Sequence, residues 1–232
     1  MLSRKKPQSL LWLALVTGFS GPVIAGLKPI DDAELSLIDS YRRNLPSSFT
    51  STSHIDMSKP GSADLMLAMR LLQTGNAKGF RKRLQSSADQ KNDYAQYMLA
   101  NLLLQEDPEA NADKALSLLT LSADQENIAA QTTLGYTLFY GKFFAQDFAT
   151  SLKWSCRAHI QGGAEATMLL AQQTYYGAGT KANIAKAIYW AKEAAALGLP
   201  AAEQKAIEWQ EISEKIPSFQ AYQPDTKNRN CP

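Results

Sequence analysis

Histidine, cysteine and excess charge are all scarce in this chain. Its 232 residues include two histidines and two cysteines, and 24 basic residues nearly balance 22 acidic ones. Neither a metal site nor a cofactor is therefore expected, because such sites need several convergent ligands. Near-neutral charge also argues against nucleic acid as the main partner, since that activity needs an excess of clustered lysine and arginine. The apolar run at residues 10–16 is too short to cross a membrane.

The N-terminus has the pattern of a secretory signal peptide. Basic residues at 4–6 precede the apolar run, and the small residues Val23 and Ala25 predict cleavage before Gly26. We therefore expect residues 1–25 to be removed and the mature protein to be periplasmic or secreted, with a retained N-terminal anchor as the alternative. No cysteine lies near the predicted cleavage site, so lipid attachment there is not expected.

The stretch 130–198 contains one pattern twice, at a constant offset of 36 residues. The first copy carries Leu134, Gly135, Gly141, Asp147, Ser151, Trp154, Ala158 and Gly162, and the second carries Leu170, Ala171, Gly177, Asn183, Ala187, Trp190, Ala194 and Gly198. Upstream, the sequence Ser-Ala-Asp-Gln at 87–90 recurs at 122–125, followed in both cases by Ala-Gln. A fixed offset of this length is typical of stacked helix-turn-helix repeats, in which each unit buries its apolar face against a neighbour.

The repeated residues have mechanical roles in such a unit. Gly141 and Gly177 are placed to end the first helix in the left-handed conformation. Asp147 and Asn183 then precede the second helix, where a side-chain oxygen caps its free amides. Gly135 lies where a side chain would hold the paired helices apart.

The rest of the chain divides around these repeats. Residues 26–61 are expected to form a short helix and a linker rich in Pro, Ser and Thr, and residues 62–215 the repeat array. In the first unit, an apolar face is predicted at Ala63, Leu67 and Leu71, followed by Phe80, Leu84 and Ala88. A terminal helix from Ala202, carrying Ile207 and Ile212, should cap the array, and residues 216–232 read as a flexible tail.

This order of residues resembles the Sel1-like repeat, a relative of the tetratricopeptide repeat. The fourth unit matches best, with Gly177-Ala178-Gly179, Asn183, Lys186-Ala187, Trp190, Ala194-Ala195 and Gly198. The resemblance covers about 63–205 and implies an all-α, right-handed superhelix of about four repeats with a capping helix. It also implies a scaffold or adaptor that binds a protein or peptide partner. Similar secreted bacterial proteins are associated with assemblies of the cell envelope.

The tetratricopeptide analogy also implies a concave groove lined by the first helix of each unit. Carried onto this sequence, the groove residues are Tyr97, Asn101, Gln105, Thr132, Tyr136, Tyr140, Gln172 and Tyr176. This surface is predicted to be uncharged, hydrogen-bonding and aromatic, which suits an extended peptide or a partner helix. Packing of several tyrosines between units is the alternative.

The two cysteines allow a disulfide in an oxidising compartment. Cys156 follows the core position Trp154 by two residues and is expected to point roughly away from the core, within reach of a tail that ends at Cys231. Two free thiols or an intermolecular link are the alternatives. Cys156 and His159 are one helical turn apart, but two ligands do not make a metal site, and Ser155 with His159 lacks a third orienting group for catalysis.

The sequence therefore favours a non-enzymatic adaptor with a partner in the cell envelope. A carbohydrate-binding protein or hydrolase is the alternative, because aromatic and amide side chains along a groove also suit sugars. A regulator controlled by its disulfide state is a third possibility.

Overall fold

The computed structural model describes residues 55–215 and Cys231. This part of the chain forms nine helices and no strand. The predicted signal peptide (1–25), most of the predicted linker, and the predicted tail apart from Cys231 lie outside the described residues. Within the described residues, none of the helices combines the length and the apolar character that a membrane span requires.

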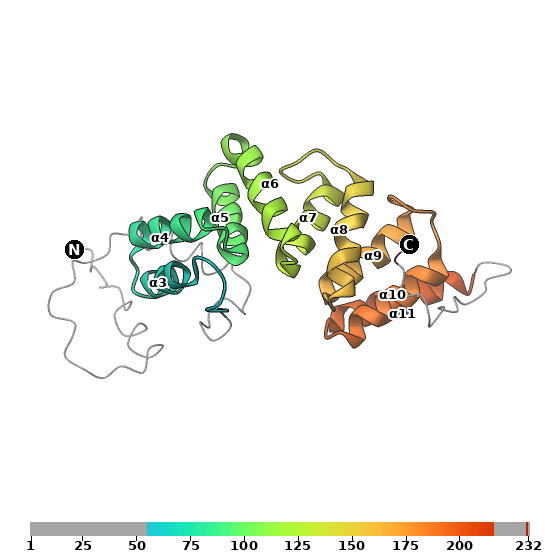
Figure 1. Ribbon diagram of the computed structural model, residues 1–232. Coiled ribbons are helices and arrows are strands. Elements are labelled where there is room, and N and C mark those ends of the chain that lie inside the picture. The colour runs from blue at the N-terminus through green and yellow to red at the C-terminus, as the bar shows by residue number, and fades with distance from the viewer. Residues whose placement is uncertain (1–54, 216–230, 232) are drawn as a thin grey trace, which may run out of the picture.

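The helices form four consecutive hairpins and one final helix. They are α3 Ser62–Gln73 with α4 Ala77–Asp89, α5 Asp93–Glu106 with α6 Pro108–Asp124, α7 Ile128–Tyr140 with α8 Phe148–Ile160, α9 Ala164–Tyr176 with α10 Ile184–Ala196, and α11 Pro200–Ser213. The hairpins follow one another in an elongated row (Figure 1), so each contacts mainly its neighbours. The predicted all-α repeat solenoid is confirmed, whereas its right-handed sense stays a prediction.

The predicted helix ends are confirmed. Gly141 and Gly177 end α7 and α9 with φ values of 66° and 75°, a conformation that glycine adopts without a steric penalty. Asp147 and Asn183 cap α8 and α10 by accepting from the backbone N–H three residues later. The same chemistry begins four of the remaining helices, at Asn76, Asn92, Asp107 and Asn127.

The close approach predicted at Gly135 is also present. A Cβ atom there would lie 2.9 Å from Ser155 Oγ, so α7 and α8 pack at a distance that a larger residue would increase. The indoles of Trp154 and Trp190 are buried at the equivalent positions of α8 and α10.

The apolar face predicted for the first helix is wrong, and the isoleucines noted on the last helix are exposed. In α3 the buried residues are Leu65, Ala68, Met69 and Leu72, whereas Ala63 is exposed and Leu67 and Leu71 are half-buried. This helix carries two interleaved apolar stripes, and α3 packs mainly against α4. Likewise α11 begins at Pro200 and packs through Ala202, Ala206 and Trp209, which leaves Ile207 and Ile212 exposed.

The recurring Ser-Ala-Asp-Gln and Ala-Gln sequences tie neighbouring helices together. Ser87 and Ser122 donate their hydroxyls to backbone carbonyls at the start of the first helix of their own hairpins, at Gly61 and Asp93. Gln131 of α7 donates its buried amide to the carbonyl of Ala123, at the end of the preceding helix. These side chains add a second hydrogen bond to carbonyls that already accept from backbone amides, such as those of Gly61 and Ala123, and so join neighbouring helices.

Candidate functional site

An open groove runs across the first helices of three successive hairpins. It has a volume of about 700 Å³ and lies along α3, α5 and α7, with the start of α9 at one end. We call it the groove; its lining is Ile55, Asp56, Lys59, Ser62, Leu65, Asn92, Asp93, Tyr94, Tyr97, Glu126, Asn127, Ile128, Ala129, Thr132, Thr133, Tyr136 and Glu165. Because each hairpin contributes one helix to it, the stacking of the repeats creates this surface.

Three of the predicted residues, Tyr97, Thr132 and Tyr136, line the groove. Tyr97 is only 7% exposed, so its ring forms part of the wall, and burial raises the pKa of its hydroxyl. Burial also raises the pKa of Tyr136 to about 12. The Tyr136 hydroxyl donates to the backbone carbonyl of Glu165 across the junction between α7 and α9. Both tyrosines are therefore neutral, positioned groups at physiological pH.

Three further predicted residues continue from Tyr136 along the same side of the stack. The Tyr140 ring is stacked on that of Tyr136, with centroids 6.2 Å apart, and its hydroxyl lies 3.4 Å from Gln172 Oε1. Tyr140 is 59% exposed and Tyr176, at the end of α9, is 68% exposed. These rings extend an aromatic row beyond the groove, where a partner can reach them.

The other two predicted residues do not belong to the groove lining. Asn101 is half-buried and donates its side-chain amide to the backbone carbonyl of Tyr97, one turn earlier in α5. Gln105 is exposed near the end of α5. The prediction extended the α5 stripe towards the C-terminal end of the helix, whereas the groove lies over its N-terminal half.

The prediction of an uncharged surface is wrong. Asp93, Glu126 and Glu165 line the groove, and Lys59 reaches in from the segment before α3. The Asp93 carboxylate is almost fully buried; it forms an ion pair of 2.8 Å with Lys59 Nζ and accepts from Asn127 Nδ2 at 3.1 Å. A charge this buried requires such partners.

A sequence signal for the missed carboxylates existed. Asp93 lies four residues before the predicted Tyr97, and Glu165 lies seven residues before the predicted Gln172, so both share a helix face with a predicted groove residue. Following the predicted groove face to the N-terminal end of α5 and of α9 would have identified both carboxylates. Glu126 precedes α7 and carries no such periodic signal.

Glu126, in the loop between α6 and α7, forms an ion pair with a residue of α8. Arg157 of α8 donates to Glu126 at 2.5 Å and to Asp124 at 3.1 Å. The hydrogen bond from Arg157 is the main cause that lowers the pKa of Glu126. The guanidinium of Arg157, on the second helix of its hairpin, therefore largely balances the negative charge of Glu126.

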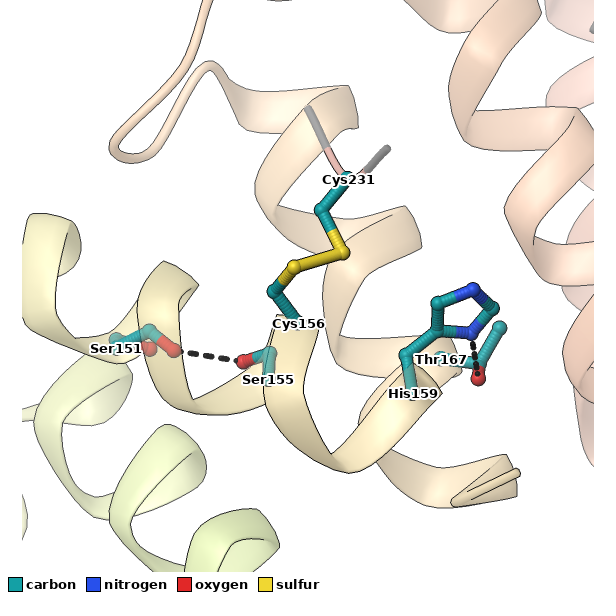
Figure 2. The surroundings of a disulfide bond; sticks show 6 residues. All are labelled: Ser151, Ser155, Cys156, His159, Thr167 and Cys231. Carbon is teal, nitrogen blue, oxygen red and sulfur yellow. Dashed lines mark hydrogen bonds between the residues drawn. A yellow bond between two sulfur atoms is a disulfide. The ribbon is translucent and has the colours of Figure 1, made fainter. Parts of the chain in front are cut away.

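The pairs on α8 considered for chemistry have structural partners instead (Figure 2). Cys156 is bonded to Cys231, with Cα atoms 5.7 Å apart, and it is half-buried against the C-terminal core instead of pointing away from it. His159 Nδ1 lies 2.8 Å from Thr167 Oγ1; because the Thr167 hydroxyl donates to Gly163, it accepts from the histidine. Buried Ser155 donates to the Ser151 carbonyl.

These contacts leave no arrangement on α8 that resembles a nucleophile with an activating base. Among the described residues, no group of three or more His, Cys, Asp or Glu side chains is placed to hold a metal ion.

The geometry defines a class of protein, the α-solenoid built from helical hairpins with a groove across its first helices. The family model of the Sel1 repeat matches residues 93–127, 128–162 and 164–199, which are the hairpins α5–α6, α7–α8 and α9–α10. Residues 93–199 of the chain therefore contain three Sel1 repeats. Sel1 repeats generally mediate protein–protein interaction, and their proteins are typically non-catalytic scaffolds.

Two solved structures illustrate the likeness. A Sel1 repeat protein from Oxalobacter formigenes is 29% identical over 55% of this chain and 97% of its own, with a TM-score of 0.49. A protective antigen present in uropathogenic Escherichia coli strains, displaying an SLR fold, is 20% identical over 83% of this chain and 57% of its own, with a TM-score of 0.36. A search of curated proteins found no significant match.

Proposed function

We propose that this chain is a non-catalytic adaptor of the periplasm or cell exterior that binds a partner protein or peptide along the groove and the adjoining tyrosine row. One observation carries the proposal: the groove is open and is assembled from the first helices of successive repeats, so an extended ligand contacts several repeats at once. The three Sel1 repeats, a kind of repeat that generally mediates protein–protein interaction, support it.

The tyrosines supply the anchors. Tyr136 is held by its hydrogen bond to Glu165, and Tyr140 is stacked on Tyr136. Rings that are already positioned lose little conformational freedom on binding, and tyrosine is among the residues that contribute most to interface affinity. The arrangement suits a partner that lies across the helices.

The disulfide supports the proposed compartment. Bonds between cysteines persist in the periplasm and outside the cell, where thiols are not kept reduced. Cys156 and Cys231 are bonded here. Together with the predicted signal peptide, this bond supports a location in the cell envelope or outside it, where the adaptor would act within an envelope-associated assembly or as a regulator.

Co-purification from native envelopes tests the proposal. The double variant Tyr136→Ala/Tyr140→Ala should lose the partners that the wild-type protein retains after cross-linking and mass spectrometry. Phe143→Ala is the control, because Phe143 is an exposed aromatic residue on the turn between α7 and α8, outside the groove. If the double variant keeps every protein partner but loses retention on a glycan panel, the adaptor proposal is wrong.

A further inference from the structure

Basic residues are distributed unevenly between the two sides of the solenoid. The first helices of the three Sel1 repeats, α5, α7 and α9, contain no lysine or arginine, whereas they contain Asp93, Glu106 and Glu165. The second helices α4, α6, α8 and α10 all carry basic residues. Because the groove is built from first helices, its field is set mainly by carboxylates.

The groove lining shows the same bias at closer range. Its carboxylates are Asp56, Asp93, Glu126 and Glu165, and its basic residue is Lys59. Tyrosine rings lie among them, and an aromatic face attracts a cation as a carboxylate does. Asp93 and Glu126 already have cationic partners in Lys59 and Arg157, so a ligand that brings positive charge meets its complementary groups chiefly at Glu165 and the tyrosine rings.

Lys59 shows what the groove accepts. Its ammonium group lies 2.8 Å from Asp93 Oδ1, yet the Lys59 side chain is 45% exposed while that of Asp93 is 5% exposed. The acceptor is thus a fixed part of the wall, and the cation comes from a segment outside the helices. A lysine of another chain can make the same pair if it replaces Lys59.

Glu165 is the carboxylate best placed for a partner. It is exposed in the first turn of α9, and no lysine or arginine among the described residues forms an ion pair with it. Its backbone is tied to the groove by the hydroxyl of Tyr136. A cation bound to Glu165 would therefore lie near the ring that we propose as an anchor.

Building on the proposed function, we propose that the groove selects an extended, basic segment of the partner, whose lysine or arginine side chains pair with Glu165 and Asp93 beside Tyr136. The tyrosines provide affinity for an extended chain, and the carboxylates determine its charge. The partner of this adaptor is then a protein with an exposed segment rich in lysine or arginine.

Fluorescently labelled synthetic peptides test the charge selection. A lysine-rich peptide is compared with two versions in which every lysine is replaced by glutamine or by glutamate, and binding is measured by anisotropy. We expect the lysine peptide to bind about tenfold more tightly than the glutamine peptide, and the glutamate peptide not to bind. Its affinity should fall as salt is added.

A matched pair of variants locates the site. Glu165→Lys should weaken binding of the lysine peptide by about tenfold, and Glu165→Gln by a smaller factor. The control is Glu109→Lys: Glu109 is also an exposed glutamate at the second position of its helix, but it lies on α6, outside the groove lining. It should leave the affinity unchanged. Thermal unfolding of all three variants checks that each retains the fold.

The outcomes separate this inference from the proposed function. Equal binding of the three peptides, or equal weakening by Glu165→Lys and Glu109→Lys, overturns the charge selection. So does a lack of peptide binding while capture of native partners still depends on Tyr136 and Tyr140, in which case the adaptor role stands. If partner capture does not depend on these tyrosines either, both proposals are wrong.

Discussion

The junctions between hairpins are polar in the first half of the solenoid and aromatic or covalent in the second. At the junction of α6 and α7, Gln131 donates to the Ala123 carbonyl and Asn127 donates to Asp93 of the earlier first helix. At the far end, Tyr175 and Trp209 are stacked with ring centroids 4.6 Å apart, and the bond to Cys231 ties the chain to α8.

This difference shows that the repeat keeps a position and a spacing, whereas the side chain at that position and its hydrogen bonds change. Thr167 replaces Gln131 one repeat later and receives a hydrogen bond from His159 instead of reaching a carbonyl of the preceding helix. Consecutive helices contact each other at every hairpin junction in both halves. We therefore expect the first half to depend on buried hydrogen bonds and the second on apolar burial and the disulfide.

The largest effect should come from breaking the covalent junction with Cys231→Ser. The bond closes a loop across a sequence separation of 75 residues, which includes α9, α10 and α11. On the loop-entropy description, losing it costs about 4 kcal/mol of unfolding free energy. Urea denaturation followed by tryptophan fluorescence measures the loss. The wild-type protein in reductant should match the variant, and reductant should not alter the variant itself; an unchanged midpoint contradicts the prediction.

Trp209→Ala should remove the aromatic contact that ends the stack. The indole is 3% exposed and stacks on Tyr175, so its loss leaves a cavity between α9 and α11 and should destabilise the protein by about 3 kcal/mol. Thermal unfolding followed by far-UV circular dichroism measures the change. Ile207→Ala is the control on the same helix: Ile207 is 46% exposed, so truncation should cost far less. Similar losses from both variants would show that α11 packs through another face.

The hairpins could be predicted from the sequence because turn chemistry recurs visibly. Gly141 with Asp147 and Gly177 with Asn183 occupy the same places 36 residues apart, and each pair ends one helix and begins the next. Which apolar stripe of a helix is buried follows from its neighbours instead. For this reason the apolar face predicted for α3 is wrong, and the isoleucines noted on α11 are exposed, although both helices exist.

The site was predicted less completely than the fold. Analogy with a related repeat identified Tyr97, Thr132 and Tyr136, which line the groove. It missed Lys59, because the ion pair between Lys59 and Asp93 joins residues 34 apart in separate elements. A contact of this kind depends on how one hairpin is placed against the next, and no local periodicity records it.

Gln131→Ala tests the polar half at its most buried hydrogen bond. The Gln131 side chain is fully buried, and its loss leaves the carbonyl of Ala123 without this donor. Gln131 also forms hydrogen bonds with Glu126 and Gln161, and each lost bond costs about 1 kcal/mol, so the variant should lose about 2 kcal/mol and unfold at a lower urea concentration. Gln105→Ala, an exposed glutamine on α5, should change nothing. If Gln131→Ala is also neutral, the first junctions do not depend on their buried amides.

The smallest effect is expected at the N-cap of the second helix, which is a titratable aspartate in α8 and an asparagine in α10. Hydrogen bonds from Thr150 lower the pKa of Asp147, whereas its counterpart Asn183 has no charge to lose. A lowered carboxyl pKa contributes stability above the unfolded pKa, and this contribution disappears as the pH falls through the folded pKa. Asp147→Asn should therefore leave stability at neutral pH almost unchanged and flatten its decline below about pH 4.

Urea midpoints measured from neutral to acidic pH provide the test, and the reciprocal variant provides the control. Asn183→Asp places a titrating cap on α10, so it should steepen the decline in stability below about pH 4 by the same mechanism. The double exchange should restore the wild-type profile, because the two caps lie in separate hairpins and their effects add. A flattened profile for Asn183→Asp, or a steeper one for Asp147→Asn, would mean that these caps do not control the acid sensitivity of their helices.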